Sequence, residues 1–371
     1  MKEKIFLKGY WENNLGDDLF VKIVCERYPD CIFYLEAQKK NLEVFKNIKN
    51  LVLLEIDNKP FSKIMRKIRY PKIGFSNYYK LSKDIKNYLE IGGSIFILED
   101  NKGKDYVLKK RNKIRKLTER YFVVGSNFGP YYYPNQLHSY QNFFSLIEGT
   151  VFRDKESFDL FQSIANVDIA PDVVFNLSIK QKDLYRDKHS FIVISVINLY
   201  NRKDFLKQEA ENYENWLVGL CAYFSRLQKK IVLMGFCENE KDSETIRRIN
   251  SLIDEPTRAN VTTHVHKELN ESLQYLYNAE LIIATRFHAM ILGWLFQKPT
   301  FVISYSRKIV DTIETWFPEQ YYTEVSNLDK CAYENINNLA TKISSECLNE
   351  ITTLAEKQFK YMDFHFDNKS I

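Results

Sequence analysis

The feature that most constrains this sequence is a regular alternation of short apolar runs with longer segments of helical periodicity. In the first half the apolar runs fall at residues 4–8, 31–35, 51–56, 94–98, 121–125 and 167–170. In the second half they fall at residues 191–197, 230–235, 260–263, 281–284 and 300–304. Parallel strands need crossover connections, which are usually helices, so this rhythm is typical of parallel sheets covered by helices. The pattern therefore predicts an α/β fold with two similar lobes facing a cleft.

The lobes are expected to meet at a polar, charged stretch at residues 178–190. With 371 residues, the chain exceeds what one hydrophobic core usually supports. We expect an N-terminal lobe at residues 1–180 and a C-terminal lobe at residues 189–332. Residues 333–371 have helical periodicity and no strand pattern after it, which predicts a helical tail that packs back on the first lobe.

The charge balance argues against nucleic acid as a partner. A net charge of +5 arises from 53 basic and 48 acidic residues, a small surplus for so many charges. Basic stretches at residues 59–72 and 109–120 are predicted to be solvated helix faces. Contact with an anionic membrane surface is the alternative interpretation, because both stretches also carry apolar residues.

The N-terminus indicates a cytoplasmic location. Met1 leads directly into Lys2-Glu3-Lys4 and a short strand, without an apolar signal segment. The chain also has no apolar stretch close to the length of about 18 residues that a membrane span needs. We expect a cytoplasmic protein, with any membrane contact peripheral and on the inner face. The six cysteines show no C-x-x-C spacing, which predicts reduced thiols and no metal site.

The strongest candidate site begins where the apolar run 281–284 leads into an apolar helix. Thr285 is the expected N-cap, so Arg286 and His288 fall in the first helical turn. A cation there costs about 0.3–1 kcal/mol against the helix dipole, so folding alone would not select it. A bound phosphate or carboxylate reverses that sign, because the backbone N–H groups, the dipole and Arg286 all attract an anion.

The next strand end supplies further cations. Ser304, Arg307 and Lys308 follow the run 300–304 and are expected to border the same crevice. A basic helix start without a ligand is the plainer interpretation of these residues. Two adjacent strand ends that both carry cations favour an anion-binding site.

The first half has a second set of candidates. Arg153 precedes a helix that Asp154 is expected to cap, and Asp172 follows Pro171 in a turn. Asp172 is interpreted either as a turn former or as a carboxylate that binds hydroxyls or pairs with a cation. Gly93 and Ser94 begin a strand pattern, where paired glycines permit close approach of another group. Each feature alone also fits a purely structural turn.

The loop after the first strand is ambiguous. Asn14 can cap the following helix, and Asp17 suits its positive first turn, so a structural role explains both. Gly9 and Gly16 permit a tight turn and close backbone approach to a ligand. No D-x-D, Walker loop, G-x-G-x-x-G, G-x-S-x-G or H-E-x-x-H occurs, which disfavours metal–diphosphate, kinase and hydrolase sites. We predict no metal.

In order, these motifs resemble those of the polysaccharide pyruvyl transferase family. The resemblance covers roughly residues 5–310. It rests on Asn14-x-Gly16-Asp17, Gly92-Gly93-Ser94-Ile95-Phe96, Gly129-Pro130, Arg153-Asp154-x-x-Ser157, Pro171-Asp172, Arg286-x-His288, and Pro299 followed by Ser304-Tyr305-x-x-Lys308. The chain departs from the pattern at Asn198, where many relatives carry Arg. Arg202 follows farther along, and the departure bears on acceptor choice and on activity.

The resemblance implies two Rossmann-like lobes in a GT-B-like arrangement. It also implies transfer of pyruvate from phosphoenolpyruvate, as a co-substrate and without another cofactor, onto two hydroxyls of one sugar. The acceptor would be a sugar or a lipid-linked oligosaccharide. The first lobe would face the acceptor and the second the donor.

The candidate residues suit that chemistry. The ordinary pKa of a histidine side chain is about 6.5, so His288 fits a general acid that protonates the methylene carbon of phosphoenolpyruvate. Arg153 and Arg286 would assist catalysis by holding the phosphate and carboxylate. The predicted donor-binding set adds Ser304, Arg307 and Lys308, and the acceptor-binding set comprises Asn14, Asp17, Asp172, Gly93 and Ser94. Two alternatives remain, a GT-B nucleotide-sugar glycosyltransferase and a non-catalytic assembly or sugar-binding protein.

Overall fold

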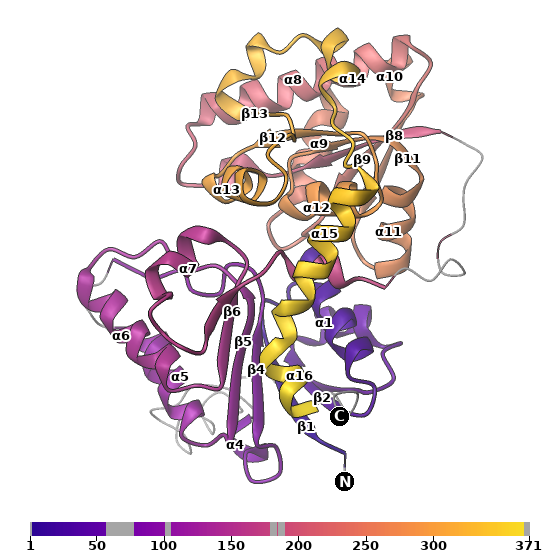
Figure 1. The fold of residues 1–371 in the computed structure, drawn as a ribbon. Helices are drawn as coiled ribbons and strands as arrows, with labels where there is room; N and C mark the ends of the chain where they lie inside the picture. The colour runs from indigo at the N-terminus through magenta and orange to yellow at the C-terminus, as the bar shows by residue number, and fades with distance from the viewer. Residues whose placement is uncertain (1, 57–77, 101–104, 179–183, 185–189, 367–371) are drawn as a thin grey trace. The chain divides into compact units, whose positions relative to one another are not determined.

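The computed structural model describes residues 2–56, 78–100, 105–178, 184 and 190–366. Within it the chain forms two compact units. The first contains Met1–Trp11, Phe20–Asn176 and Thr353–Ile371, and the second contains Glu12–Leu19 and Leu177–Thr352. Figure 1 shows the strands and helices of both units.

The first unit is built on a seven-stranded sheet in which every paired strand is parallel. Its spatial order is β3-β2-β1-β4-β5-β6-β7, the order of a doubly wound Rossmann sheet with one added strand. The strands are β1 Lys4–Lys8, β2 Ile32–Ala37, β3 Leu51–Glu55, β4 Asn87–Ile91, β5 Arg120–Ser126, β6 Gly149–Phe152 and β7 Val167–Ile169. The strand order reverses between β1 and β4.

Helices connect these strands. They are α1 Leu15–Arg27, α2 Lys39–Leu42, α4 Tyr78–Leu81, α5 Tyr106–Arg115, α6 Pro134–Ser145 and α7 Lys155–Phe161, with short 3-10 turns η1 Glu43–Phe45 and η2 Val173–Asn176. An aromatic cluster fills one side of this unit, where the rings of Phe128 and Phe161 lie 4.8 Å apart edge to face. Edge-to-face packing of large rings buries much apolar area, which holds α6 and α7 against the sheet.

The second unit repeats the same plan with six parallel strands in the order β10-β9-β8-β11-β12-β13. The strands are β8 Phe191–Val196, β9 Lys230–Gly235, β10 Val261–Val265, β11 Ala279–Ala284, β12 Thr300–Ser304 and β13 Tyr322–Glu324. The helices are α8 Lys207–Arg226, α9 Asp242–Leu252, α10 Glu255–Arg258, α11 Leu269–Asn278, α12 Phe287–Leu295, α13 Arg307–Trp316, α14 Ile336–Leu339, α15 Ser345–Ala355 and α16 Lys360–Phe366, the last of which belongs to the first unit. The remaining 3-10 turns are η3 Leu199–Asn201, η4 Val325–Lys330 and η5 Tyr333–Asn335, and η6 Glu356–Phe359, which like α16 belongs to the first unit.

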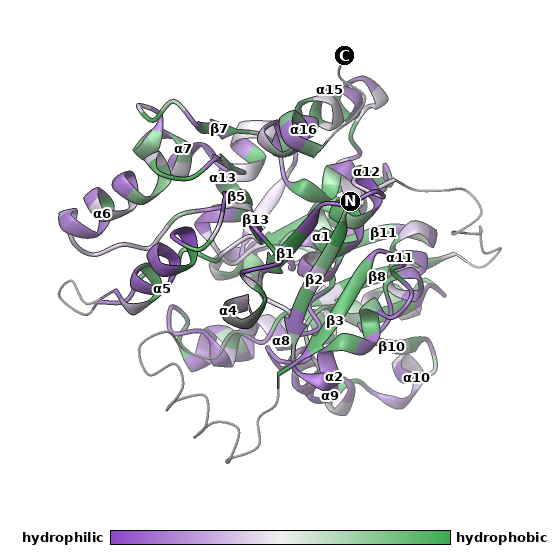
Figure 2. Cartoon of the chain, turned by 90° about the horizontal axis from the view of Figure 1, so that it is seen from below, coloured by the Kyte–Doolittle hydropathy of each residue, from purple (hydrophilic) through white to green (hydrophobic). Residues whose placement is uncertain are grey.

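Hydropathy follows this layering. In Figure 2 the strands are largely hydrophobic in colour, whereas α5 is largely hydrophilic. β12 is buried along its whole length, as expected for a parallel strand covered on both faces. Among the described residues, no helix has both the length and the apolar character that crossing a bilayer requires.

The predicted α/β class with two Rossmann-like lobes and a helical tail is confirmed by these two sheets. One predicted strand is wrong. Residues 94–98 form no strand apart from an isolated bridge at Phe96, and the chain instead pairs β4, Asn87–Ile91, into the sheet. β4 carries buried Asn87 and Glu90, so its composition does not read as an apolar run.

Two further differences concern segment assignments. Residues 12–19 join the second unit, because Leu15 N–H donates to the Phe236 carbonyl at 3.0 Å and Asn14 forms a bridge with Cys237. Within the tail, only Thr353–Ile371 belongs to the first unit.

The basic stretch 109–120 is not only a solvated face. Arg111 is buried and donates to buried Glu90 through Nε at 3.0 Å and Nη2 at 2.7 Å. The stretch 59–72 lies outside the described residues.

Candidate active site

The second sheet changes strand order between β8 and β11, the position at which open α/β sheets usually bind ligands, outside the carboxyl ends of their strands. Polar residues follow several of these ends. Arg202 comes after β8, Glu240 and Asp242 after β9, Arg286 after β11, and Lys308 after β12. We call these five residues the charged cluster.

The turn from β11 into α12 is fixed by a buried serine. Ser195, in β8, accepts the backbone N–H of Thr285 at 3.0 Å and that of Arg286 at 3.1 Å. The Thr285 side chain is also occupied, because the Tyr213 hydroxyl donates to it at 3.1 Å. The predicted N-cap is therefore wrong by one residue: Arg286 is the N-cap, without a side-chain capping bond, and His288 is the second residue of α12.

Arg286 is buried and held by two carboxylates. Its Nε donates to Asp242 Oδ2 at 3.0 Å, its Nη2 donates to Asp242 Oδ1, and its Nη1 donates to Glu240 Oε2 at 2.7 Å. Only 6% of Arg286 is exposed. Asp242 is fixed in turn by the backbone N–H groups of Phe236 and Cys237. Arg286 is thus not the isolated cation that its sequence position indicates, and the acids explain how a buried arginine is tolerated there.

Two less buried cations complete the charged cluster. Arg202 donates to Glu240 Oε2 at 3.1 Å and lies 4.5 Å above the ring of Tyr305. The Lys308 ammonium lies 5.6 Å from the ring centre of Phe287 and 5.9 Å from that of Tyr305. Three cations against two carboxylates leave a positive surplus. Nearly a third of the Arg202 side chain is exposed, whereas the Arg286 side chain is buried.

Burial raises the pKa of Asp242, but the pKa directions of Glu240 and Tyr305 agree with that surplus. Burial opposes ionisation of Glu240, but Arg286, Arg202 and Lys308 together hold its pKa below the usual range. Burial also opposes ionisation of the Tyr305 phenol, yet Lys308, Arg202 and Arg286 lower its pKa. A phenol whose pKa falls despite burial indicates a positive local field, which also attracts phosphate or carboxylate.

The imidazole of His288 packs against the glycine loop at the start of α1. A Cβ added to Gly16 would lie 1.8 Å from His288 Nδ1, so only glycine fits there. Asn14 shapes this loop, because its Oδ1 accepts the Gly16 N–H at 3.2 Å and its carbonyl accepts the Asp18 N–H at 2.8 Å. Asn14 and Asp17 were expected in the first lobe, but both lie in the same unit as His288.

In the first unit the structure brings Arg153, Asp172, Gly93 and Ser94 together. Arg153 donates to Asp172 Oδ2 at 2.9 Å and to Asn127 Oδ1 at 3.0 Å, and Ser94 donates to the same Asn127 oxygen at 3.1 Å. A Cβ on Gly93 would lie 2.4 Å from the Arg153 guanidinium. Asp172 both forms an ion pair and accepts a turn N–H, that of Val174 at 2.9 Å.

Other predicted residues have different surroundings. Arg307 pairs with Asp311 and Glu314 of its own helix, and 71% of its side chain is exposed, so no contact joins it to the charged cluster among the described residues. Ser304 is buried and donates to the Ser306 carbonyl at 3.2 Å. Asp17 is buried in the first turn of α1.

Sequence reasoning missed the acidic half of the charged cluster. Glu240 and Asp242 follow an apolar strand by five and seven residues, and a carboxylate pair at such a strand end is the available signal. Nothing local to them reveals that Arg286, more than 40 residues later, is their partner.

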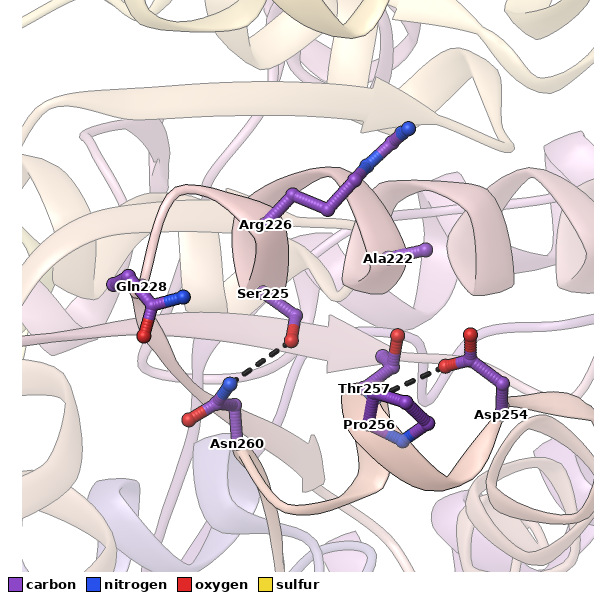
Figure 3. A pocket seen from close by; sticks show the side chains of 8 residues that line it. All are labelled: Ala222, Ser225, Arg226, Gln228, Asp254, Pro256, Thr257 and Asn260. Carbon is purple, nitrogen blue, oxygen red and sulfur yellow. Dashed lines mark hydrogen bonds between the residues drawn. The ribbon is translucent and has the colours of Figure 1, made fainter.

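A separate pocket of about 390 Å³ lies on the opposite edge of the second sheet, where Gln228 and Asn260 precede β9 and β10. Figure 3 shows a hydrogen bond between Asn260 and Ser225 and another between Asp254 and Thr257. The first bond links the residue before β10 to α8, and the second caps the start of α10. Ligands of open α/β sheets gather at carboxyl strand ends, so this pocket is not a candidate site.

Solved structures with the same fold share little sequence with this chain. A UDP-GlcNAc 2-epimerase from Neisseria meningitidis, bound to UDP-GlcNAc, has 12% identity and a TM-score of 0.61, covering 97% of this chain and 99% of that one. A putative UDP-N-acetylglucosamine 2-epimerase from Listeria monocytogenes has 11% identity and a TM-score of 0.59, covering 100% and 98%. HepE from Anabaena, in complex with UDP and glucose, has 11% identity and a TM-score of 0.55, covering 99% and 96%. These similarities establish a GT-B-like fold alone.

Sequence comparison is more specific. No curated protein sequence gives a significant match. The family model described as polysaccharide pyruvyl transferase matches residues 14–307, which include the Gly16 loop, Arg153, and the Arg286–His288 turn. Because this match spans most of the chain, the protein belongs to the polysaccharide pyruvyl transferase family.

Proposed function

We propose that this protein transfers a pyruvyl group from phosphoenolpyruvate to two hydroxyls of one sugar in a surface-polysaccharide precursor. The products are a cyclic ketal and inorganic phosphate. The family match over residues 14–307 is the observation that carries this proposal. The positive surplus of the charged cluster supports it, because phosphoenolpyruvate presents a phosphate and a carboxylate.

In this proposal the donor binds at the carboxyl ends of β8, β11 and β12. Arg202 and Lys308 are the partly exposed cations that reach its anionic groups. Arg286 acts mainly by fixing Glu240, which positions Arg202. Ser304 shapes the end of β12, and Arg153 keeps its predicted role as a donor-binding residue. Arg307 pairs with Asp311 of its own helix, and we leave it out of the proposed donor contacts.

His288 is the proposed general acid. It gives a proton to the methylene carbon of phosphoenolpyruvate, which leaves an oxocarbenium-like centre at the adjacent carbon. One sugar hydroxyl attacks that centre, and the second hydroxyl then displaces phosphate. The two hydroxyls release two protons, one of which leaves with phosphate while the other restores the protonated form of His288. Gly16 fixes the imidazole plane, so the acid is oriented before the donor binds.

The acceptor side is proposed from the remaining predicted residues. Asp172, Gly93 and Ser94 surround Arg153 in the first unit, and Asn14 and Asp17 flank Gly16 in the second. Carboxylates and amides of this kind bind sugar hydroxyls. We propose that the acceptor is a sugar or a lipid-linked oligosaccharide, which the protein binds in the cytoplasm at the inner face of the membrane.

The proposal is tested by incubating the protein with phosphoenolpyruvate and a panel of acceptors. Mass spectrometry should show acceptors that gain pyruvate less water, with one phosphate released for each. His288→Ala should lower the rate about 100-fold or more, the usual scale for removing a general acid. Glu314→Gln, on the exposed face of α13, is the matched control and should keep the wild-type rate. Equal rates for His288→Ala and Glu314→Gln would exclude the assigned acid.

A nucleotide-sugar glycosyltransferase is the second candidate. It is favoured by the shared fold with structures that contain UDP-GlcNAc or UDP with glucose. Identities of 11–12% carry the fold and not the donor. Transfer of a hexose from a nucleotide sugar, without phosphate release from phosphoenolpyruvate, would identify this second function.

A further inference from the structure

A line of buried polar side chains runs through the second unit from solvent to the start of α1. It comprises His264 in β10, Ser272 in α11, His266 directly after β10, and Asp18 in the first turn of α1. Asp18 and Ser272 have no exposed surface, and His266 and His264 are exposed by 1% and 7%. None of these four residues has a role in the proposed reaction.

Hydrogen bonds join the four residues without a break, and Glu271 lies near the outer end at more than hydrogen-bond distance. Glu271, whose side chain is 55% exposed, lies 3.8 Å from His264 Nδ1. His264 Nε2 lies 2.9 Å from Ser272 Oγ, and Ser272 Oγ lies 2.8 Å from His266 Nδ1. His266 Nε2 lies 3.1 Å from Asp18 Oδ2. In each imidazole, one ring nitrogen therefore faces Ser272 and the other faces the acidic residue at that end of the line. The serine hydroxyl lies between the two rings.

This line has two complete hydrogen-bonding states. In the first, both rings are protonated on Nε2, so His264 donates to Ser272, Ser272 donates to His266, and His266 donates to ionised Asp18. In the second, both rings are protonated on Nδ1 and every donor points the other way, with Asp18 as a neutral acid. One proton taken up at His264 Nδ1 and one passed to Asp18 convert the first state into the second. No imidazolium and no serine alkoxide is left.

The surroundings of the line favour that exchange. Burial raises the pKa of Asp18 well above its usual value, and burial lowers the pKa of His266 to about 4. Burial likewise lowers the pKa of His264, where Glu271 acts in the opposite sense and His266 and Lys267 act in the same sense. Within the described part of the chain, Asp18 Oδ1 has no hydrogen-bond partner, as suits a neutral acid. The Tyr275 ring packs on His264 at 4.6 Å.

We propose that His264, Ser272, His266 and Asp18 form a proton wire between solvent at Glu271 and the first turn of α1. Its destination rests on the proposed function. Asp18 is two residues from Gly16, whose backbone packs against the His288 imidazole. Pyruvyl transfer needs a proton at one step and releases protons at others, so a site closed by substrates benefits from a route to solvent.

The wire is tested directly by nuclear magnetic resonance of protein labelled with 15N-histidine. The ring shifts report which nitrogen carries the proton. In the wild type, His264 and His266 should change from Nε2–H to Nδ1–H together, with one midpoint, as the pH falls. In Ser272→Ala the two rings should lose this shared midpoint. Ser225→Ala, which removes another buried hydroxyl with one side-chain hydrogen bond, is the matched control and should keep it. Separate midpoints, or an unchanged tautomer, in the wild type would overturn the wire.

A kinetic arm tests the destination. Ser272→Ala and His264→Gln, which breaks the line at its outer end, should each lower kcat at least about tenfold while leaving KM for phosphoenolpyruvate unchanged. Ser225→Ala should keep the wild-type kcat. A wild-type kcat in both wire variants would refute the link to the reaction. If the wild type transfers no pyruvyl group at all, the proposed function fails, and the resonance titration still decides whether the wire exists.

Discussion

Arg286 illustrates how a single side chain can have a different role from the one its position indicates. At the start of an apolar helix, a cation is unfavourable unless an anion compensates for it. The structure supplies that anion within the protein, through Asp242 and Glu240. Arg286 therefore lies at the centre of the charged cluster. It holds Glu240 in place, and Arg202 donates to the same carboxylate.

Replacing Asp242 by Asn tests this description. The substitution leaves a buried guanidinium with one carboxylate in place of two, so the free energy of unfolding should fall by about 3 kcal/mol. Urea denaturation measures the loss. Glu314→Gln removes an acid that pairs with an exposed arginine and should cause a clearly smaller change. Equal losses in the two variants would mean that Asp242 does not hold Arg286 in solution.

Sequence alone identified the residue types of the site better than their partners. Arg153, Asp172, Gly93 and Ser94 were selected from a helix start, a turn and a glycine pair, and they form one connected group. Arg307 was selected because it follows a strand end, but helical periodicity places it beside Asp311 and Glu314. The position of a residue after a strand end predicts the region in which it lies. The direction of its side chain depends on the turn that follows the strand.

At the scale of elements, the contact between the α1 loop and α12 is set by one missing side chain. Gly16 allows the loop to lie against His288, and the bridge between Asn14 and Cys237 holds the loop beside the end of β9. The loop was read from sequence as a helix start with a capping asparagine. That reading does not show which helix it contacts, because the contact spans more than 250 residues of chain.

A double-mutant cycle measures this contact. Gly16→Ala places a methyl group into the space of the His288 ring and should destabilise the protein by about 1–3 kcal/mol, the usual cost of overpacking. In a His288→Ala background the ring is absent, so the same change should cost much less. Thermal or urea unfolding of the four proteins gives the coupling. A cost that is the same in both backgrounds would contradict the packing.

Elements with mixed polarity were the hardest to predict. β4 was missed because Asn87 and Glu90 interrupt its apolar pattern, and both are paired with residues from other elements. β13 has three residues, fewer than a periodicity argument can detect. By contrast, β8 and β12 are continuous apolar runs, so they were found with nearly correct bounds.

At the scale of the whole molecule, both units use the same strand order around the reversal point of the sheet. This repetition explains why alternation along the chain was sufficient to predict the fold class. It does not predict which unit a short segment joins, as Glu12–Leu19 shows. Fold also does not select the donor, because structures with the same fold contain nucleotide sugars. The donor has to be inferred from the charged cluster and the family.

Calorimetric titration with phosphoenolpyruvate, beside a parallel titration with UDP, tests the donor assignment most directly. We expect phosphoenolpyruvate to bind, with an affinity that falls as salt is added and falls further in Arg202→Ala and Lys308→Ala, while UDP gives no heat of binding. Binding of UDP without binding of phosphoenolpyruvate would contradict the account.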